Sequence, residues 1–188
     1  MEQNYISNDV FEQIKDFISD NLSEEQKLLI DKLISNEESK QRYKLNGLCE
    51  GCKQPNTEHY WCQPCNSKHF QQNFKNWTSG NSDVDKLIQE SQLNAKSYEK
   101  VLEWIEYDKF EDIEYITKGG FGKVYKANWK DGFIVYWDNE TNQWKRSVDI
   151  YGNKSVALKS LNNSKDITLE FLNEVNITNK ICKQITYY

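Results

Sequence analysis

Residues 116–124 read Ile116-Thr117-Lys118-Gly119-Gly120-Phe121-Gly122-Lys123-Val124, a glycine-rich stretch between two β-rich runs. Because glycine has no Cβ, such a stretch at the tip of a hairpin lets backbone N–H groups approach phosphate oxygens closely. The surrounding runs are β-rich and separated by turn residues, which predicts strands over 110–116, 124–129, 133–137 and 155–159. A further hairpin is predicted from Trp137 to Trp144, and we interpret it as an insertion that decorates the sheet.

A lysine and a pair of acids follow the glycine-rich stretch. Lys159 ends the run Val156-Ala157-Leu158-Lys159 on a later strand, from where its ammonium group can reach the same phosphates. Apolar periodicity then predicts a helix over 166–180. Glu170 and Glu174 lie one turn apart on this helix, so an acid on that face can pair with the lysine and hold it in place.

This order of motifs resembles the N-terminal lobe of protein kinases: a glycine-rich loop, a V-A-I-K strand, and a helix, αC, that carries the paired glutamate. Gly119, Gly122 and Val124 match the second glycine, the third glycine and the valine of G-x-G-x-x-G-x-V, while Thr117 replaces the first glycine. Residues 170–175 resemble αC of the tyrosine-kinase-like group. With its flanking helices and cysteine pairs, the whole arrangement is similar to kinases from the large expanded families of some root-symbiotic fungi.

The resemblance covers about residues 110–185 and implies an ATP site. ATP would lie against loop residues 116–124, with Val124 and Ala157 covering the adenine, Lys159 on the α- and β-phosphates, and Glu174 paired with Lys159. Members of the family transfer phosphate from ATP to protein hydroxyls. Residues 1–188 contain no H-R-D-x-x-x-x-N and no D-F-G segment, so we expect a lobe truncated after αC that is inactive alone. The alternative is a non-catalytic, zinc-containing interaction or regulatory module.

Four of the five cysteines form two C-x-x-C pairs, Cys49 with Cys52 and Cys62 with Cys65. Each pair can present two thiolates to one metal ion, and two such pairs form the closed four-cysteine site that is typical of structural zinc. Two alternatives stay open: the cysteines carry no metal, or they form two disulfides. His59 and His69 are close enough in sequence for either to replace one sulfur, and the alternative is that each is an ordinary surface histidine.

The residues before the glycine-rich stretch are predicted to be mainly helical. A helical hairpin is expected over 1–45, with its second helix starting at a capping box formed by Ser23 and Gln26. We interpret this hairpin as a packing element or as the surface that meets a protein partner. The other expected domains are a zinc-binding module over 46–75, a helical linker over 76–108 with helical spacing through 82–106, and a partial kinase N-lobe over 109–188, an antiparallel sheet plus αC. The predicted fold class is therefore α+β.

Composition narrows the function classes. The formal net charge is −5 and no basic stripe is present, which argues against nucleic-acid binding. No apolar run approaches the roughly 20 residues that a membrane span requires. Residues 1–20 also lack the apolar segment of a secretory signal. Because paired cysteines of this kind fit a reducing cytosol, the prediction is a cytoplasmic protein with no membrane or nucleic-acid partner.

Overall fold

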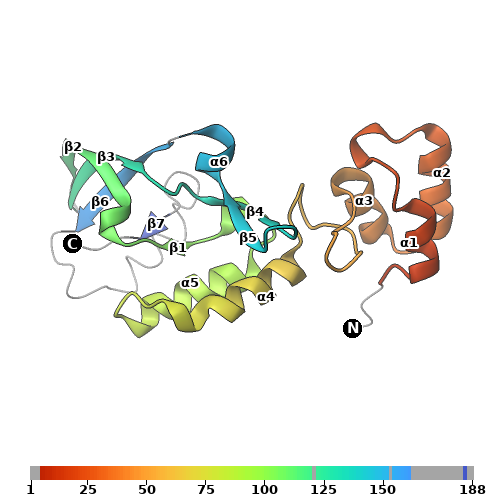
Figure 1. Cartoon of the computed structure of the whole chain (residues 1–188), viewed down its shortest axis with the longest axis horizontal. Helices are drawn as coiled ribbons and strands as arrows, with labels where there is room; N and C mark the ends of the chain where they lie inside the picture. The colour runs from red at the N-terminus through yellow and green to blue at the C-terminus, as the bar shows by residue number, and fades with distance from the viewer. Residues whose placement is uncertain (1–4, 120–121, 153, 162–183, 186–188) are drawn as a thin grey trace. The chain divides into compact units, whose positions relative to one another are not determined.

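The computed structural model of the chain describes residues 5–119, 122–152, 154–161 and 184–185. The chain divides into two compact units, Met1–Asn66 and Ser67–Tyr188. Helices and antiparallel strands occur together, which confirms the predicted α+β class (Figure 1). The helix predicted over 166–180 lies outside the described residues. Within the described part of the chain, no helix combines the length and apolar character needed to cross a bilayer.

The first unit packs three α-helices around an apolar core. Ser23 caps the second helix as predicted, because its Oγ accepts a hydrogen bond from Gln26 N at 3.2 Å and Gln26 Oε1 accepts one from Ser23 N at 2.9 Å. The third helix, which the sequence did not predict, carries Tyr43, whose hydroxyl donates to the Ile14 carbonyl at 2.7 Å. Burial raises the pKa of Tyr43 to about 12. The helices are α1 (Asn8–Ile14), α2 (Glu24–Leu33) and α3 (Glu37–Asn46), and the core comprises Ile6, Ile14, Ile30, Ile34 and Tyr43.

Two longer helices follow. Helix α4 (Gln63–Asn73) begins in the first unit and ends in the second, where α5 (Ser82–Asn94) lies beside it (Figure 1). Ser67 Oγ on α4 donates to the Leu93 carbonyl on α5 at 2.7 Å. The N-terminus of α5 is capped by Asn81, whose side chain accepts hydrogen bonds from the second and third residues of the helix.

The helix predicted over 82–106 is correct only as far as Asn94, because the chain beyond α5 forms a short 3-10 turn at Tyr98–Lys100 and then an extended segment that returns along that helix. Ser91 and Gln92 hold this return segment. Ser91 Oγ donates to the Lys100 carbonyl at 2.8 Å and accepts from Leu102 N at 3.0 Å, while Gln92 Nε2 donates to the Leu102 carbonyl at 2.9 Å. The apolar residues of the segment are thus buried in extended rather than helical form; they are Val101, Leu102 and Ile105.

Strands β2 (Phe110–Gly119), β3 (Gly122–Trp129) and β6 (Lys154–Leu161) form an antiparallel sheet in the order β2-β3-β6. They contain three of the predicted strands, which are thereby confirmed. One face of the sheet is buried: Ala127 and Leu158 are 1% and 3% exposed and belong to one core cluster with Phe110 and Trp129. On the other face, Lys126 and Ala157 are exposed. The apolar core therefore lies on one side of this sheet only.

The hairpin predicted around Trp137 and Trp144 is confirmed as β4 (Ile134–Asp138) and β5 (Gln143–Arg146), a separate two-stranded sheet. It packs on α4 through its aromatic rings, because Trp137 stacks on His69 with centroids 3.8 Å apart and Trp144 stacks on Phe70 at 4.4 Å. The hairpin is therefore packed into the second unit. Helix α6 (Ser147–Tyr151) follows β5, and β1 (Glu103–Trp104) and β7 (Gln184–Ile185) form a parallel pair.

Candidate metal centre and glycine-rich hairpin

The first cysteine pair, Cys49 and Cys52, lies on a tight turn after α3 that we call the first knuckle. Cys49 N donates to the Gln54 carbonyl and Lys53 N donates to the Cys49 carbonyl, both at 2.8 Å, so the chain reverses at once. Arg42 on α3 holds the far side of the turn by donating to the Pro55 carbonyl at 2.6 Å. The reversal brings the two sulfurs of the pair together.

The second pair, Cys62 and Cys65, lies where a tight hairpin meets α4, and we call it the second knuckle. Trp61 N donates to the Glu58 carbonyl at 2.9 Å, and Trp61 itself is fully buried. The Cys62 carbonyl accepts from Asn66 N at 2.9 Å, so Cys62 directly precedes the first turn of α4, which carries Cys65. A helix N-terminus favours a nearby thiolate, because its unpaired N–H groups carry partial positive charge.

The structure brings all four predicted cysteines together. Their sulfur atoms lie within 4.8 Å of one another, and two contacts connect the knuckles: Cys49 Sγ to Cys65 Sγ at 3.8 Å and Cys52 Sγ to Cys62 Sγ at 3.6 Å. Cys49 and Cys62 are buried, while Cys52 and Cys65 are half-buried. Four convergent thiols in two turns form a cluster that can bind a metal ion.

The close sulfurs alter one another's acidity. Hydrogen bonds with Cys49, Cys62 and Cys65 lower the pKa of the Cys52 thiol. The hydrogen bond with Cys52 raises the pKa of Cys49, but those with Cys62 and Cys65 bring it down to about 7. Hydrogen bonds with Cys49, Cys52 and Cys65 raise the pKa of Cys62. These mutual hydrogen bonds stabilise a thiolate within the cluster, and a thiolate is the form of cysteine that binds metal.

Neither candidate histidine belongs to the sulfur cluster in the described part of the chain. His59 is exposed, and its ring lies against Tyr60 with centroids 4.1 Å apart. His69 stacks on Trp137 with an interplanar angle of 11°, and burial lowers the pKa of its ring. His69 therefore acts as an aromatic packing residue.

The glycine-rich stretch forms the hairpin between β2 and β3. Thr117 pairs with Val124, Lys118 with Lys123, and Gly119 with Gly122. Side chains at the base of the hairpin, from Ile116 to Lys118 and at Lys123, are exposed. Gly120 and Phe121, the tip residues of the predicted loop, lie outside the described residues.

Strand β6 lies beside the hairpin with a register that brings the predicted residues together. Val124 is directly opposite Lys159, and Lys126 is directly opposite Ala157. Because residues two apart on a strand share a face, positions 124, 157 and 159 lie on the face opposite the apolar core. Glu174, the predicted partner of Lys159, lies outside the described residues.

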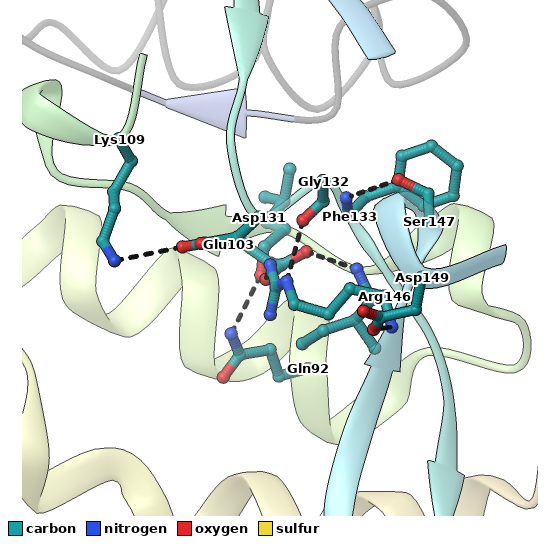
Figure 2. Close-up of polar contacts among 11 residues, drawn as sticks. Gln92, Glu103, Lys109, Asp131, Gly132, Phe133, Arg146, Ser147 and Asp149 are labelled. Atoms are coloured by element: carbon teal, nitrogen blue, oxygen red, sulfur yellow. Dashed lines mark hydrogen bonds and ion pairs between the residues drawn. The ribbon is translucent and has the colours of Figure 1, made fainter. Parts of the chain in front are cut away.

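Figure 2 shows a buried polar network at the base of the β4–β5 hairpin, which the sequence did not predict. The Arg146 guanidinium pairs with Glu103 Oε2 and donates from Nε to the Gly132 carbonyl at 2.8 Å. The other Glu103 oxygen accepts from Ile134 N at 2.9 Å. Arg146 also lies over the Trp129 ring, 5.2 Å from its centroid. One side chain thus joins β1, the end of β3 and β5.

A turn beside this network depends on glycine. Ser147, which is fully buried, accepts from Phe133 N at 3.0 Å through Oγ and donates from its own N to the Phe133 carbonyl at 2.8 Å. Gly132, which precedes Phe133 in the chain, has φ of 64°, and a Cβ there would lie 2.3 Å from Ser147 Oγ. No spacing pattern in the sequence indicates the ion pair between Glu103 and Arg146, because both residues resemble ordinary surface charges.

Comparison of the chain with protein-family models, with curated proteins and with solved structures gives no match.

Proposed function

We propose that the β2-β3-β6 sheet covers ATP in the manner of a protein-kinase N-terminal lobe. The observation that carries the proposal is the strand register, which aligns Val124 with Lys159 and puts Ala157 on the same face of the sheet. An adenine ring needs a small apolar surface, and the phosphates need a cation and free backbone N–H groups. Val124 and Ala157 supply the apolar surface for adenine. Lys159 supplies the cation, and the hairpin that begins at Gly119 supplies the backbone N–H groups.

The proposed roles follow from this arrangement and from the kinase resemblance. Lys159 contacts the α- and β-phosphates, Glu174 pairs with it, and Thr117 takes the place of a glycine at the entrance to the loop. Residues 1–188 contain neither an H-R-D nor a D-F-G segment. We therefore propose weak ATP binding, millimolar or weaker, and no phosphoryl transfer for these residues by themselves, because the acid that holds Mg²⁺ on the phosphates is not among them.

A lysine-directed probe tests the proposal. An acyl-phosphate analogue of ATP transfers its acyl group to a lysine amine beside the bound phosphates. We expect Lys159 to be labelled, and millimolar ATP to protect it more than it protects Lys100, an exposed lysine outside this sheet that serves as the control. Equal labelling of Lys100 and Lys159, with no protection by ATP, would contradict the proposal.

We also propose that the cysteine cluster binds one zinc ion in a structural role. All four ligand positions are sulfur, so none remains for a catalytic water. The first unit has a small core, and a structural zinc ion contributes on the order of 10 kcal/mol to folding in such modules. Metal analysis of protein purified without a histidine tag should find one zinc per chain. A zinc content near zero, with the four thiols free under reducing conditions, would exclude this assignment.

The alternative function is a non-catalytic cytoplasmic module, in which the helices of the first unit and the metal site meet a protein partner. Exposed apolar side chains on that unit favour it, because Ile18, Leu28 and Leu45 are 68%, 69% and 68% exposed. Two measurements on the same sample separate the alternatives. Bound zinc without ATP-protected labelling of Lys159 supports the interaction module, whereas both results together support the kinase-like lobe.

A further inference from the structure

The cysteine cluster has an arrangement suited to chemistry other than metal binding. Two sulfur contacts run between the knuckles, from Cys49 to Cys65 at 3.8 Å and from Cys52 to Cys62 at 3.6 Å. In each contact, one cysteine is buried and the other is half-buried. A small oxidant can therefore reach Cys65 or Cys52, and each has a sheltered thiol within 3.8 Å.

We propose that the cluster is a site of reversible oxidation, at which a peroxide converts the four thiolates into two disulfides, Cys49–Cys65 and Cys52–Cys62. Release of metal during the reaction rests on the proposed zinc site, whereas the disulfide pairing rests on the sulfur geometry alone. A disulfide needs sulfurs about 2.05 Å apart, so each pair closes by a shift of less than 2 Å, which side-chain rotation supplies.

The reaction balances with peroxide as the oxidant. The accessible thiolate attacks the peroxide, the O–O bond breaks, and a sulfenic acid and a hydroxide form. The sheltered thiolate then attacks the sulfenic sulfur, which forms the S–S bond and expels a second hydroxide. Each disulfide thus passes two electrons to one peroxide, and the hydroxides take up protons to give water. Two disulfides consume two peroxides, and a metal ion held by the cluster would be released as the free dication because no thiolate would remain to bind it.

The proposed disulfide pairing keeps the two knuckles joined, as a shared metal ion would. Both disulfides join the first knuckle to the second, across sequence separations of 16 and 10 residues. Disulfides within each C-x-x-C pair would instead leave the two knuckles without a covalent link. We therefore infer that oxidation exchanges one cross-link for another, so that the first unit remains folded while it loses its metal.

Trypsin distinguishes the two outcomes, because Lys53 lies between the knuckles. Cleavage after Lys44, Lys53 and Lys68 gives one peptide with both cysteines of the first knuckle, 45–53, and one with both of the second, 54–68. The metal-loaded chain is treated with hydrogen peroxide, alkylated and digested without reduction. We expect a disulfide-linked pair of these peptides that separates after reduction. Recovery of two separate peptides, each with an internal disulfide, or of alkylated thiols would overturn the proposal.

Matched double variants decide which sulfurs pair, and they are tested free of metal. Cys52→Ser with Cys62→Ser retains the contact between Cys49 and Cys65. Cys52→Ser with Cys65→Ser retains two buried sulfurs, Cys49 and Cys62. We expect the first variant to form its disulfide about tenfold faster or more, because one of its sulfurs is accessible. Equal rates would overturn the pairing.

A chromogenic zinc chelator, present during oxidation of the unmodified chain, follows the metal separately. Release of one zinc per chain, with the helical circular-dichroism signal retained, is the expected result. Loss of that signal on oxidation would overturn the inferred exchange of cross-links. A chain that never contained zinc refutes the proposed metal site, yet the peptide linkage and the variant rates still decide the pairing.

Discussion

Gly132 lies in a turn where both the backbone and the surroundings exclude a side chain. Its φ is 64°, and an added Cβ would lie 2.3 Å from Ser147 Oγ and 2.9 Å from Val148 N. We expect Gly132→Ala to lower the free energy of unfolding by about 2–4 kcal/mol, from left-handed strain of roughly 1–2 kcal/mol plus the displacement of Ser147. Urea unfolding followed by tryptophan fluorescence measures the change.

Gly80 is the matched control for this substitution, since it has φ of 80° but an added Cβ there would meet no atom within 4 Å. Gly80→Ala should cost only the backbone strain, about 1 kcal/mol. Equal losses for the two variants would show that the contact with Ser147 does not contribute.

His69 makes stability depend on pH near neutrality. Burial lowers the pKa of its ring from the usual 6.5, so the unfolded chain takes up the proton first as the pH falls. The free energy of unfolding should therefore decrease below about pH 6.5 and level off once the folded ring is also protonated. In His69→Phe, which retains an aromatic ring against Trp137, this decrease should disappear; in His59→Asn, a substitution at an exposed site, it should persist.

At the residue scale, the sequence predicts some parts of the sites and omits others for a physical reason. The four cysteines were predictable because C-x-x-C spacing is itself the geometry of a metal-binding turn. Glu103 and Arg146 were not, because they are 43 residues apart and their pairing depends on the return of the chain along α5. The identity of a charged residue does not show whether its side chain is buried or solvated in the folded chain.

At the scale of elements, β-rich runs separated by turn residues predicted the strands of the sheet. Strands β2, β3 and β6 all contribute side chains to one apolar cluster, which is why these runs contain apolar and aromatic residues. Helix α3 was missed because it is largely charged and begins at an Asn36 cap rather than at an apolar stripe. The helix over 82–106 was extended too far, since the side-chain hydrogen bonds that hold the return segment leave no mark on hydrophobic spacing.

The ion pair between Glu103 and Arg146 fastens the β4–β5 hairpin to β1, and its side chains are only 11% and 24% exposed. Removing one partner leaves the other charge buried without a counter-ion, which costs several kcal/mol in a fully buried pair. We expect Arg146→Met to lower the free energy of unfolding by about 2–4 kcal/mol. Glu103→Gln should do the same, and the double variant should lose less than the sum of the two.

The control pair lies in the same unit and is also visible in Figure 2. Lys109 and Asp131 are 3.2 Å apart, but their side chains are 48% and 44% exposed. Asp131→Asn should therefore change stability by less than about 1 kcal/mol. If Arg146→Met costs no more than this control, the network does not anchor the hairpin.

At the scale of the whole molecule, the two units should differ in their response to metal removal. The four sulfurs of the cluster all belong to the first unit, Met1–Asn66, whose apolar core is small. With the proposed zinc ion bound, a strong chelator under reducing conditions should therefore unfold that unit, while the sheet around Ala127, Trp129 and Leu158 retains its structure. Heteronuclear NMR checks this result, with loss of dispersed signals expected for residues 5–60 and persistence expected for residues 105–160. Loss of both sets of signals would show that the sheet depends on the metal site.

The cysteine cluster and the ion pair between Glu103 and Arg146 also differ in when they can form during synthesis. The cysteines lie close together in sequence, with Cys49 and Cys65 separated by 16 residues, so the cluster can close while the ribosome is still adding the sheet. Arg146 must leave the ribosome before it can reach Glu103, and until then the return segment along α5 has no counter-ion for its buried carboxylate. The first unit can therefore fold early during synthesis, whereas the second unit cannot finish folding until the β4–β5 hairpin has left the ribosome.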